Sequence, residues 1–91
     1  MKFETKFKIK DKIWVICKNF NEEKDDFEWK VEHTQRIIIR IFTCCDEKGT
    51  DITYHTNYLD GSTCISFFGE QNCFATKEEA QAECDRRNNG R

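Results

Sequence analysis

Cysteine and histidine are the residues of this chain that could hold a metal ion or take part in a reaction. The sequence has six cysteines and two histidines in 91 residues. A structural zinc site commonly takes two ligands from a close C-x₂₋₄-C pair, because one turn then presents both thiolates to the ion. The chain has no such pair, and the adjacent Cys44 and Cys45 would point to opposite faces of a strand. Zinc would therefore need ligands from separate elements.

Two interpretations of the cysteines stay open. A zinc-stabilised structural domain would draw its ligands from Cys44, His55, Cys73 and Cys84. The competing interpretation expects no cofactor and treats the thiols as small apolar side chains of the core. Cys84 follows Ala80 by four residues, which places both on one face of a helix and suits packing against a sheet.

Nothing in the sequence is typical of an enzyme. A cysteine nucleophile needs a base within reach and a lowered thiol pKa, and neither His33 nor His55 stands with a cysteine in a recognised motif. Motifs of metalloproteases, serine hydrolases, phosphate-binding loops and calcium loops are absent from the sequence. We therefore expect a non-enzymatic protein.

An acidic segment suggests a binding surface instead. Its candidate contact residues are Glu22, Glu23, Asp25, Asp26 and Glu28, with the aromatic residues Phe20 and Trp29. Clustered carboxylates can imitate phosphate groups and occupy a basic channel of a partner, and exposed aromatic side chains can anchor a protein interface. The alternative is a solvated loop without a partner.

A row of lysines near the N-terminus suggests a different partner. Lys6, Lys8, Lys10 and Lys12 alternate with other residues, so one face of a strand could follow a phosphate backbone. The same pattern also protects an exposed edge strand against aggregation. The net charge of −2 disfavours nucleic acid as the partner.

The elements that must position these residues are mainly β. Alternating apolar residues predict strands at about 5–17, 27–33, 36–45, 51–58 and 62–68. Residues 13–17 are apolar on both sides, which predicts that both faces of this segment are covered. Thr76 and Glu79 form a capping box that opens a helix at about 77–88. We expect one α+β domain, 1–91, in which a small curved antiparallel sheet or SH3-like barrel of about five strands carries one C-terminal helix.

Two turns predict the register of the middle strands. Lys48-Gly49 and Asp60-Gly61 are both typical of two-residue hairpin loops. In both registers the same side chains share one face of the sheet: Ile37, Ile39, Ile41, Tyr54, Tyr58, Ile65 and Phe67.

The two ends of the chain resemble a group of small, mostly uncharacterised proteins of bacteriophages and prophages. The similar segments are F-K-I-K-D-K-I-W-V-I at 7–16 and N-C-F-A-T-K-E-E-A-Q-A-E-C-D-R-R-N at 72–88, about a third of the chain. In that group an F-x-I-G-D-x-V-W strand opens a small barrel and an F-x-T-x-E-E-A helix closes it. Lys10 stands where that pattern has glycine, a departure that bears on the first turn.

The resemblance implies an accessory protein that acts by stoichiometric binding to a host protein, such as an anti-CRISPR-like inhibitor of a host defence nuclease. No segment is apolar and long enough to cross a membrane, and the first residues have no apolar region typical of a secretion signal. We therefore expect a protein partner, no membrane, and a location in the host cytoplasm, where the cysteines stay reduced. The sequence leaves open the identity of the partner and the oligomeric state.

Overall fold

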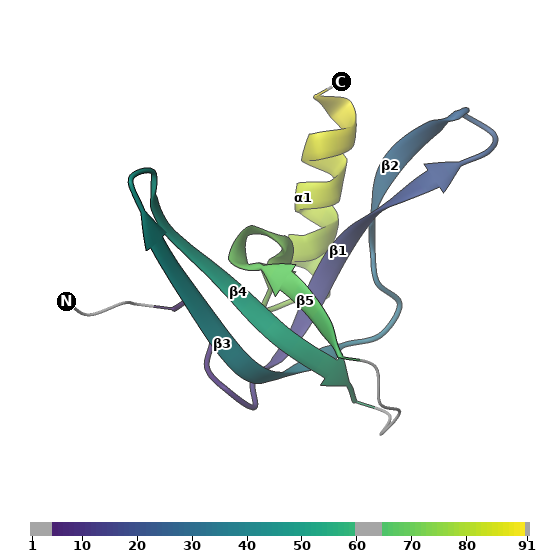
Figure 1. Cartoon of the computed structure of the whole chain (residues 1–91). Coiled ribbons are helices and arrows are strands. Elements are labelled where there is room, and N and C mark those ends of the chain that lie inside the picture. The colour runs from purple at the N-terminus through teal and green to yellow at the C-terminus, as the bar shows by residue number, and fades with distance from the viewer. Residues whose placement is uncertain (1–4, 60–64, 91) are drawn as a thin grey trace.

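The computed structural model describes residues 5–59 and 65–90, and in this part of the chain a sheet carries one helix at its C-terminal end (Figure 1). The elements are β1 (Lys12–Asn21), β2 (Asp26–Val31), β3 (Arg36–Asp46), β4 (Gly49–Tyr58), β5 (Ser66–Gly69), a 3₁₀ turn (Glu70–Asn72), β6 (Cys73–Phe74) and α1 (Lys77–Asn89). The strand order is β2-β1-β3-β4-β5, with β6 paired to β1, and every pairing is antiparallel. The predicted mainly β fold with a C-terminal helix is confirmed, as an open curved sheet and not as a closed barrel.

The first half of strand β1 is covered on both faces, as the sequence predicts for residues 13–17. Ile13 and Val15 are fully buried in the main core, and Ile16 is buried on the opposite side against the helix. The main core also contains Phe7, Ile38, Tyr54 and Cys73. Because successive side chains of a strand point to opposite faces, this one strand joins the sheet core to the helix layer.

Helix α1 begins directly after its N-cap residue, Thr76. The hydroxyl of Thr76 accepts a hydrogen bond from the backbone N–H of Glu79 at 3.1 Å, which satisfies one of the donors that the first turn leaves open. Ala80 and Cys84 are the buried residues of the helix. Their small side chains let α1 lie close to β1 and β2, against which it packs.

The N-terminal segment differs from the prediction, because β1 begins only at Lys12. Before it, the Asp11 carboxylate accepts a hydrogen bond from the N–H of Lys8 at 2.9 Å, and the N–H of Asp11 donates to the carbonyl of Lys8 at 3.0 Å. These bonds close a turn, since a side chain that bonds the nearby backbone competes with strand pairing. Lys10 has φ 78° in this turn. Of the lysines that were expected to form a row on one strand, Lys6, Lys8 and Lys10 therefore lie in a bent segment, and Lys12 begins β1.

The predicted hairpin registers are wrong. Asp46 lies opposite Gly49, so the β3–β4 loop is one residue earlier than expected, and a bulge interrupts the pairing between Ile38 and Arg40. The second predicted turn, 60–61, lies outside the described residues, and Tyr54 pairs with Phe68 instead of Phe67.

These shifts change which face several side chains occupy. Ile41, Tyr54 and Tyr58 lie on the inner face as predicted, and Phe68 packs there in place of Phe67. Phe67 and Ile65 are 63% and 55% exposed. The bulge explains why Ile37 and Ile38 have exchanged faces relative to the prediction, because one extra residue in a strand reverses the alternation of the residues that precede it. As a result Ile38 is buried in the core, and Ile37 is on the outer face opposite Asn57.

Arg36 is a charged residue inside this core, with 4% of its surface exposed. Its Nε and Nη2 each donate to the Glu32 carboxylate at 2.8 Å, and its Nη1 donates to the hydroxyl of Thr56 at 3.4 Å. Its guanidinium also lies over the rings of Tyr58 and Phe68, at 4.1 and 5.0 Å from their centroids. One side chain thus links the β2–β3 connection to β4 and β5.

We expect Lys10→Gly to raise the free energy of unfolding by about 1 kcal/mol, because glycine adopts a positive φ without the steric cost that lysine bears. Urea-induced unfolding measures the change. Lys8→Gly is the matched control in the same turn, and it should bring no gain, because Lys8 has no positive φ. Equal effects of the two substitutions would contradict the prediction.

We expect Glu32→Gln to lower the free energy of unfolding by about 3 kcal/mol, since it leaves a buried guanidinium without its carboxylate. Combining it with Arg36→Met should recover part of that loss, because the unpaired charge is then gone. Glu23→Gln, at an exposed position, serves as the control and should change stability little. If Glu32→Gln and Glu23→Gln prove equally mild in urea, the ion pair does not stabilise the fold.

Candidate functional site

The tip of the β1–β2 hairpin exposes two large aromatic side chains to solvent. Phe20 and Phe27 lie opposite each other on the two strands, with ring centroids 5.3 Å apart in an edge-to-face arrangement. They are 52% and 48% exposed. Two large aromatic side chains in solvent carry apolar area that a partner could bury.

The turn that follows Phe20 is ordered by Asn21. The side-chain oxygen of Asn21 accepts hydrogen bonds from the N–H groups of Glu23 and Lys24 at 2.9 and 3.3 Å. Asp25 completes the turn with φ 52°, and its N–H donates to the carbonyl of Glu22 at 3.3 Å. Asparagine and aspartate favour these conformations because their short side chains bond the local backbone. The tip is therefore a defined turn.

Four of the five predicted acidic residues are exposed at this tip: Glu22, Glu23, Asp25 and Asp26. Together with the two phenylalanines they form what we name the acidic tip: Phe20, Glu22, Glu23, Asp25, Asp26 and Phe27. Since all four carboxylates lie within one turn and the residue that follows it, their negative potential is concentrated at the end of a projecting hairpin (Figure 1).

Glu28, the fifth predicted acidic residue, belongs to the framework of the hairpin. Its carboxylate accepts a hydrogen bond from the Asn21 side chain at 3.0 Å and pairs with Lys24 and Lys30 at 3.3 and 3.4 Å. The hydrogen bond from Asn21, followed by those from the two lysines, lowers the pKa of this carboxyl. Glu28 thus holds the base of the turn, and its charge is neutralised locally.

Trp29 was also predicted as a contact residue, and the structure places it against the helix. Its ring lies 4.4 Å from the guanidinium carbon of Arg87 and packs on the buried cluster of Ile16, Ala80 and Cys84. Phe27 takes the exposed role instead. The sequence contained a signal for the position of Phe27, because a loop over 22–25 places Phe27 directly opposite Phe20 on the neighbouring strand.

The four predicted zinc ligands do not come together. Cys73 is buried in the main core and Cys84 in the cluster beneath the helix, whereas Cys44 is exposed on β3. His55 lies on β4 between the rings of Phe42 and Phe67, at 4.0 and 3.9 Å. Across residues 5–59 and 65–90, no three histidine, cysteine or acidic side chains are grouped to hold a metal ion.

The surroundings of the two buried thiols favour their neutral form. Burial, and then the charge of Glu70, raises the pKa of Cys73 to about 12. Burial likewise raises the pKa of Cys84. Both residues therefore pack as small neutral side chains among apolar neighbours.

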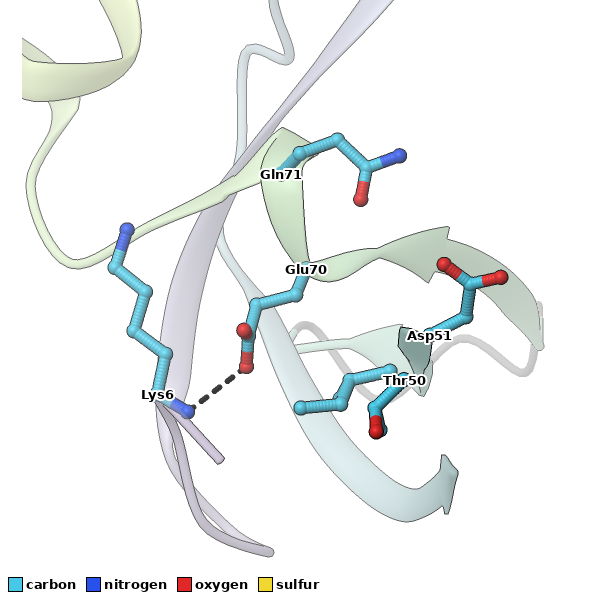
Figure 2. A pocket seen from close by; sticks show the side chains of 6 residues that line it. Lys6, Thr50, Asp51, Glu70 and Gln71 are labelled. Carbon is cyan, nitrogen blue, oxygen red and sulfur yellow. Dashed lines mark hydrogen bonds between the residues drawn. The ribbon is translucent and has the colours of Figure 1, made fainter. Parts of the chain in front are cut away.

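A shallow pocket beside the N-terminal segment is lined by Lys6 and Glu70, which hold this segment against the core (Figure 2). The Glu70 carboxylate accepts hydrogen bonds from the N–H of Lys6 at 2.8 Å and from the Tyr54 hydroxyl at 2.5 Å, and that hydroxyl accepts from the N–H of Phe7 at 3.1 Å. The Lys6 side chain extends away from Glu70 (Figure 2) and lies over the rings of Phe7 and Phe74. The network fastens the N-terminal segment to the core.

The outer face of the sheet carries a second exposed aromatic group, which we name the aromatic row: Phe42, His55 and Phe67. It crosses β3, β4 and β5, and its two phenylalanines are 47% and 63% exposed. Phe67 was expected on the opposite face, and the register shift in β5 places it here, opposite His55. Helix α1 packs against β1, β2 and β6, which is another part of the sheet.

Comparison with known proteins gives no further assignment. No protein-family model matches the chain, and no similar curated protein or solved structure was found. Among the described residues, no helix combines the length and apolar character needed to span a membrane.

We expect the free energy of unfolding to be constant at neutral pH and to fall as the pH rises from about 9 toward 12. Burial raises the pKa of Cys73 to about 12 from its ordinary 9.0, and burial with the Glu70 hydrogen bond raises that of Tyr54. Above the ordinary pKa, only the unfolded chain releases these protons readily, so alkaline pH favours unfolding. Urea unfolding at about pH 8 and pH 10 measures the slope. Cys73→Ala should make the slope less steep and leave the part that Tyr54 contributes, and an unchanged slope would contradict the contribution of Cys73.

Proposed function

We propose that this chain is a non-enzymatic binding protein that docks on a basic protein surface through the acidic tip. The observation that carries the proposal is the exposed Phe20–Phe27 pair, held edge to face directly beside a turn of carboxylates. A few anchoring side chains, aromatic residues among them, carry most of the binding energy of typical interfaces, and surrounding charges select and steer the partner. The tip contains both.

The order of the turn strengthens this proposal. Binding loses affinity when loops must be immobilised, so a turn already fixed by its own hydrogen bonds binds at a smaller entropic cost. Asn21 supplies that order, since its side chain bonds two N–H groups of the turn and the carboxylate of Glu28. The arrangement therefore presents its charges in a constant geometry.

The partner class follows from the charges of the tip. A cluster of carboxylates on a narrow hairpin matches a basic groove that normally receives phosphate groups. The resemblance of both chain ends to phage and prophage accessory proteins supports a host protein as the partner, in the host cytoplasm. A defence nuclease whose nucleic-acid channel is blocked by the tip is our specific form of the proposal.

Nucleic-acid binding through the lysines has less support. Lys6 lies over two phenylalanine rings, 5.5 and 5.2 Å from their centroids, and Lys10 lies in a turn. The lysines therefore do not follow one line along which a phosphate backbone could run.

We expect Glu22→Lys combined with Glu23→Lys to abolish capture of a protein partner from a bacterial lysate by the immobilised chain. Phe20→Ala should weaken capture by about 30-fold, in line with the loss of an aromatic anchor. The matched control is Glu47→Lys with Asp51→Lys, which makes the same charge change on the exposed β3–β4 hairpin and should leave capture intact. Capture that survives the tip substitutions, or is lost equally in the control, would remove the acidic tip from the proposal.

A further inference from the structure

The far half of strand β3 has one open backbone edge within the described part of the chain. At its beginning, β3 pairs with β1 through Ile37 and Arg36, and Ile38 bonds the backbones of Lys10 and Asp11. From Arg40 to Asp46, its described neighbour is β4 alone, on the other side. Residues 42–46 are all exposed. An antiparallel strand directs alternate N–H and C=O groups to each side, so this edge offers a row of groups for pairing.

The outer edge of β2 shows how this chain covers an edge elsewhere. The Asn88 side chain on α1 accepts a hydrogen bond from the N–H of Trp29 at 2.9 Å and donates to the Trp29 carbonyl at 3.1 Å. One amide thereby occupies both backbone groups of an edge residue. On β3, the segment I-F-T-C-C between Arg40 and Asp46 contains no charge and no proline, which are the usual protections of an edge.

We propose that this edge pairs with the same edge of a second copy of the chain, antiparallel, about a two-fold axis at Thr43. In that register Thr43 faces its own counterpart, and Phe42 faces Cys44 of the second copy. Arg40 faces Asp46 of the second copy, and the symmetry repeats this pair at the other end. Opposite charges directly across two strands stabilise the pairing.

The charges select this register over its neighbours. A shift that keeps the two-fold axis but centres it on Phe42 places Arg40 opposite Cys44, and the ion pairs are lost. A shift that centres it on Cys44 places Arg40 opposite Lys48, and like charges repel. The edge is thus complementary to itself in one arrangement, and a two-fold contact closes after two copies.

The surroundings of the β3 edge also favour pairing with a second copy of the chain. Beyond the reach of β5, which pairs with residues 53–56 of β4, the β3–β4 hairpin is a two-stranded ribbon, and such ribbons are marginal alone in water. Pairing would also bring the aromatic rows of two copies onto one continuous outer face. The acidic tip lies on the other hairpin (Figure 1), so this dimer would present two tips, and the two proposals fail independently.

Sedimentation equilibrium from about 10 μM to about 1 mM tests the proposal, since a contact with a Kd in this range is then resolved. We expect the wild-type chain to form a dimer. Thr43→Lys and Thr43→Glu each place like charges opposite each other at the axis and should weaken the dimer more than about tenfold. An equal mixture of the two variants should form a heterodimer. Thr50→Lys, on β4 of the same ribbon, is the matched control and should dimerise as wild type.

Arg40→Glu and Asp46→Lys form a second pair of variants, which keeps the test valid if position 43 tolerates no charge. Each alone repels its counterpart and should be monomeric, and their mixture restores both ion pairs in this register only. A wild-type chain that stays monomeric at about 1 mM would overturn the proposal. A dimer that Thr50→Lys dissociates and Thr43→Lys does not would also overturn it, because the interface would then lie on β4.

Discussion

The buried guanidinium of Arg36 is the constraint on which the arrangement of the sheet depends. Arg36 is the residue at which β3 pairs with β1 on one side, opposite Ile13, and with β4 on the other, opposite Tyr58. A charge in the core is tolerated only where its donors meet acceptors. The Glu32 carboxylate and the Thr56 hydroxyl meet those of Arg36. The connection from β2 and the start of β3 are therefore held in one position relative to β4.

The bulge that follows Arg36 divides β3 into two parts with different roles. Before it, Ile38 is buried in the core beside Tyr54. After it, the alternation is reversed, and Phe42 points to the outer face, where its ring lies 4.0 Å from that of His55. The same strand thus contributes to the core at one end and carries an exposed aromatic surface at the other. A strand without the extra residue could not do both with this sequence.

The two hairpins differ in the chemistry that they expose. The β1–β2 tip concentrates carboxylates beside an exposed aromatic pair, and Asn88 covers the edge of β2 at Trp29. The far half of the β3–β4 hairpin has an uncharged edge with Arg40 and Asp46 at its ends. The first is the surface that we propose for a basic partner, whereas the second is the edge that we propose to pair with an identical strand. Binding to a partner and self-association would therefore use separate parts of the molecule.

Local patterns in the sequence determined the elements of this fold: the helix cap at Thr76 and the two-faced burial of residues 13–17 follow from short-range chemistry. The acidic tip was also foreseen in its charges and in Phe20. Tertiary structure decided the rest. Whether Phe67 or Phe68 enters the core depends on a register shift of one residue, and whether Trp29 or Phe27 is exposed depends on where the helix packs. Alternation has the same period in either register, so only pairing across strands and packing between layers could choose.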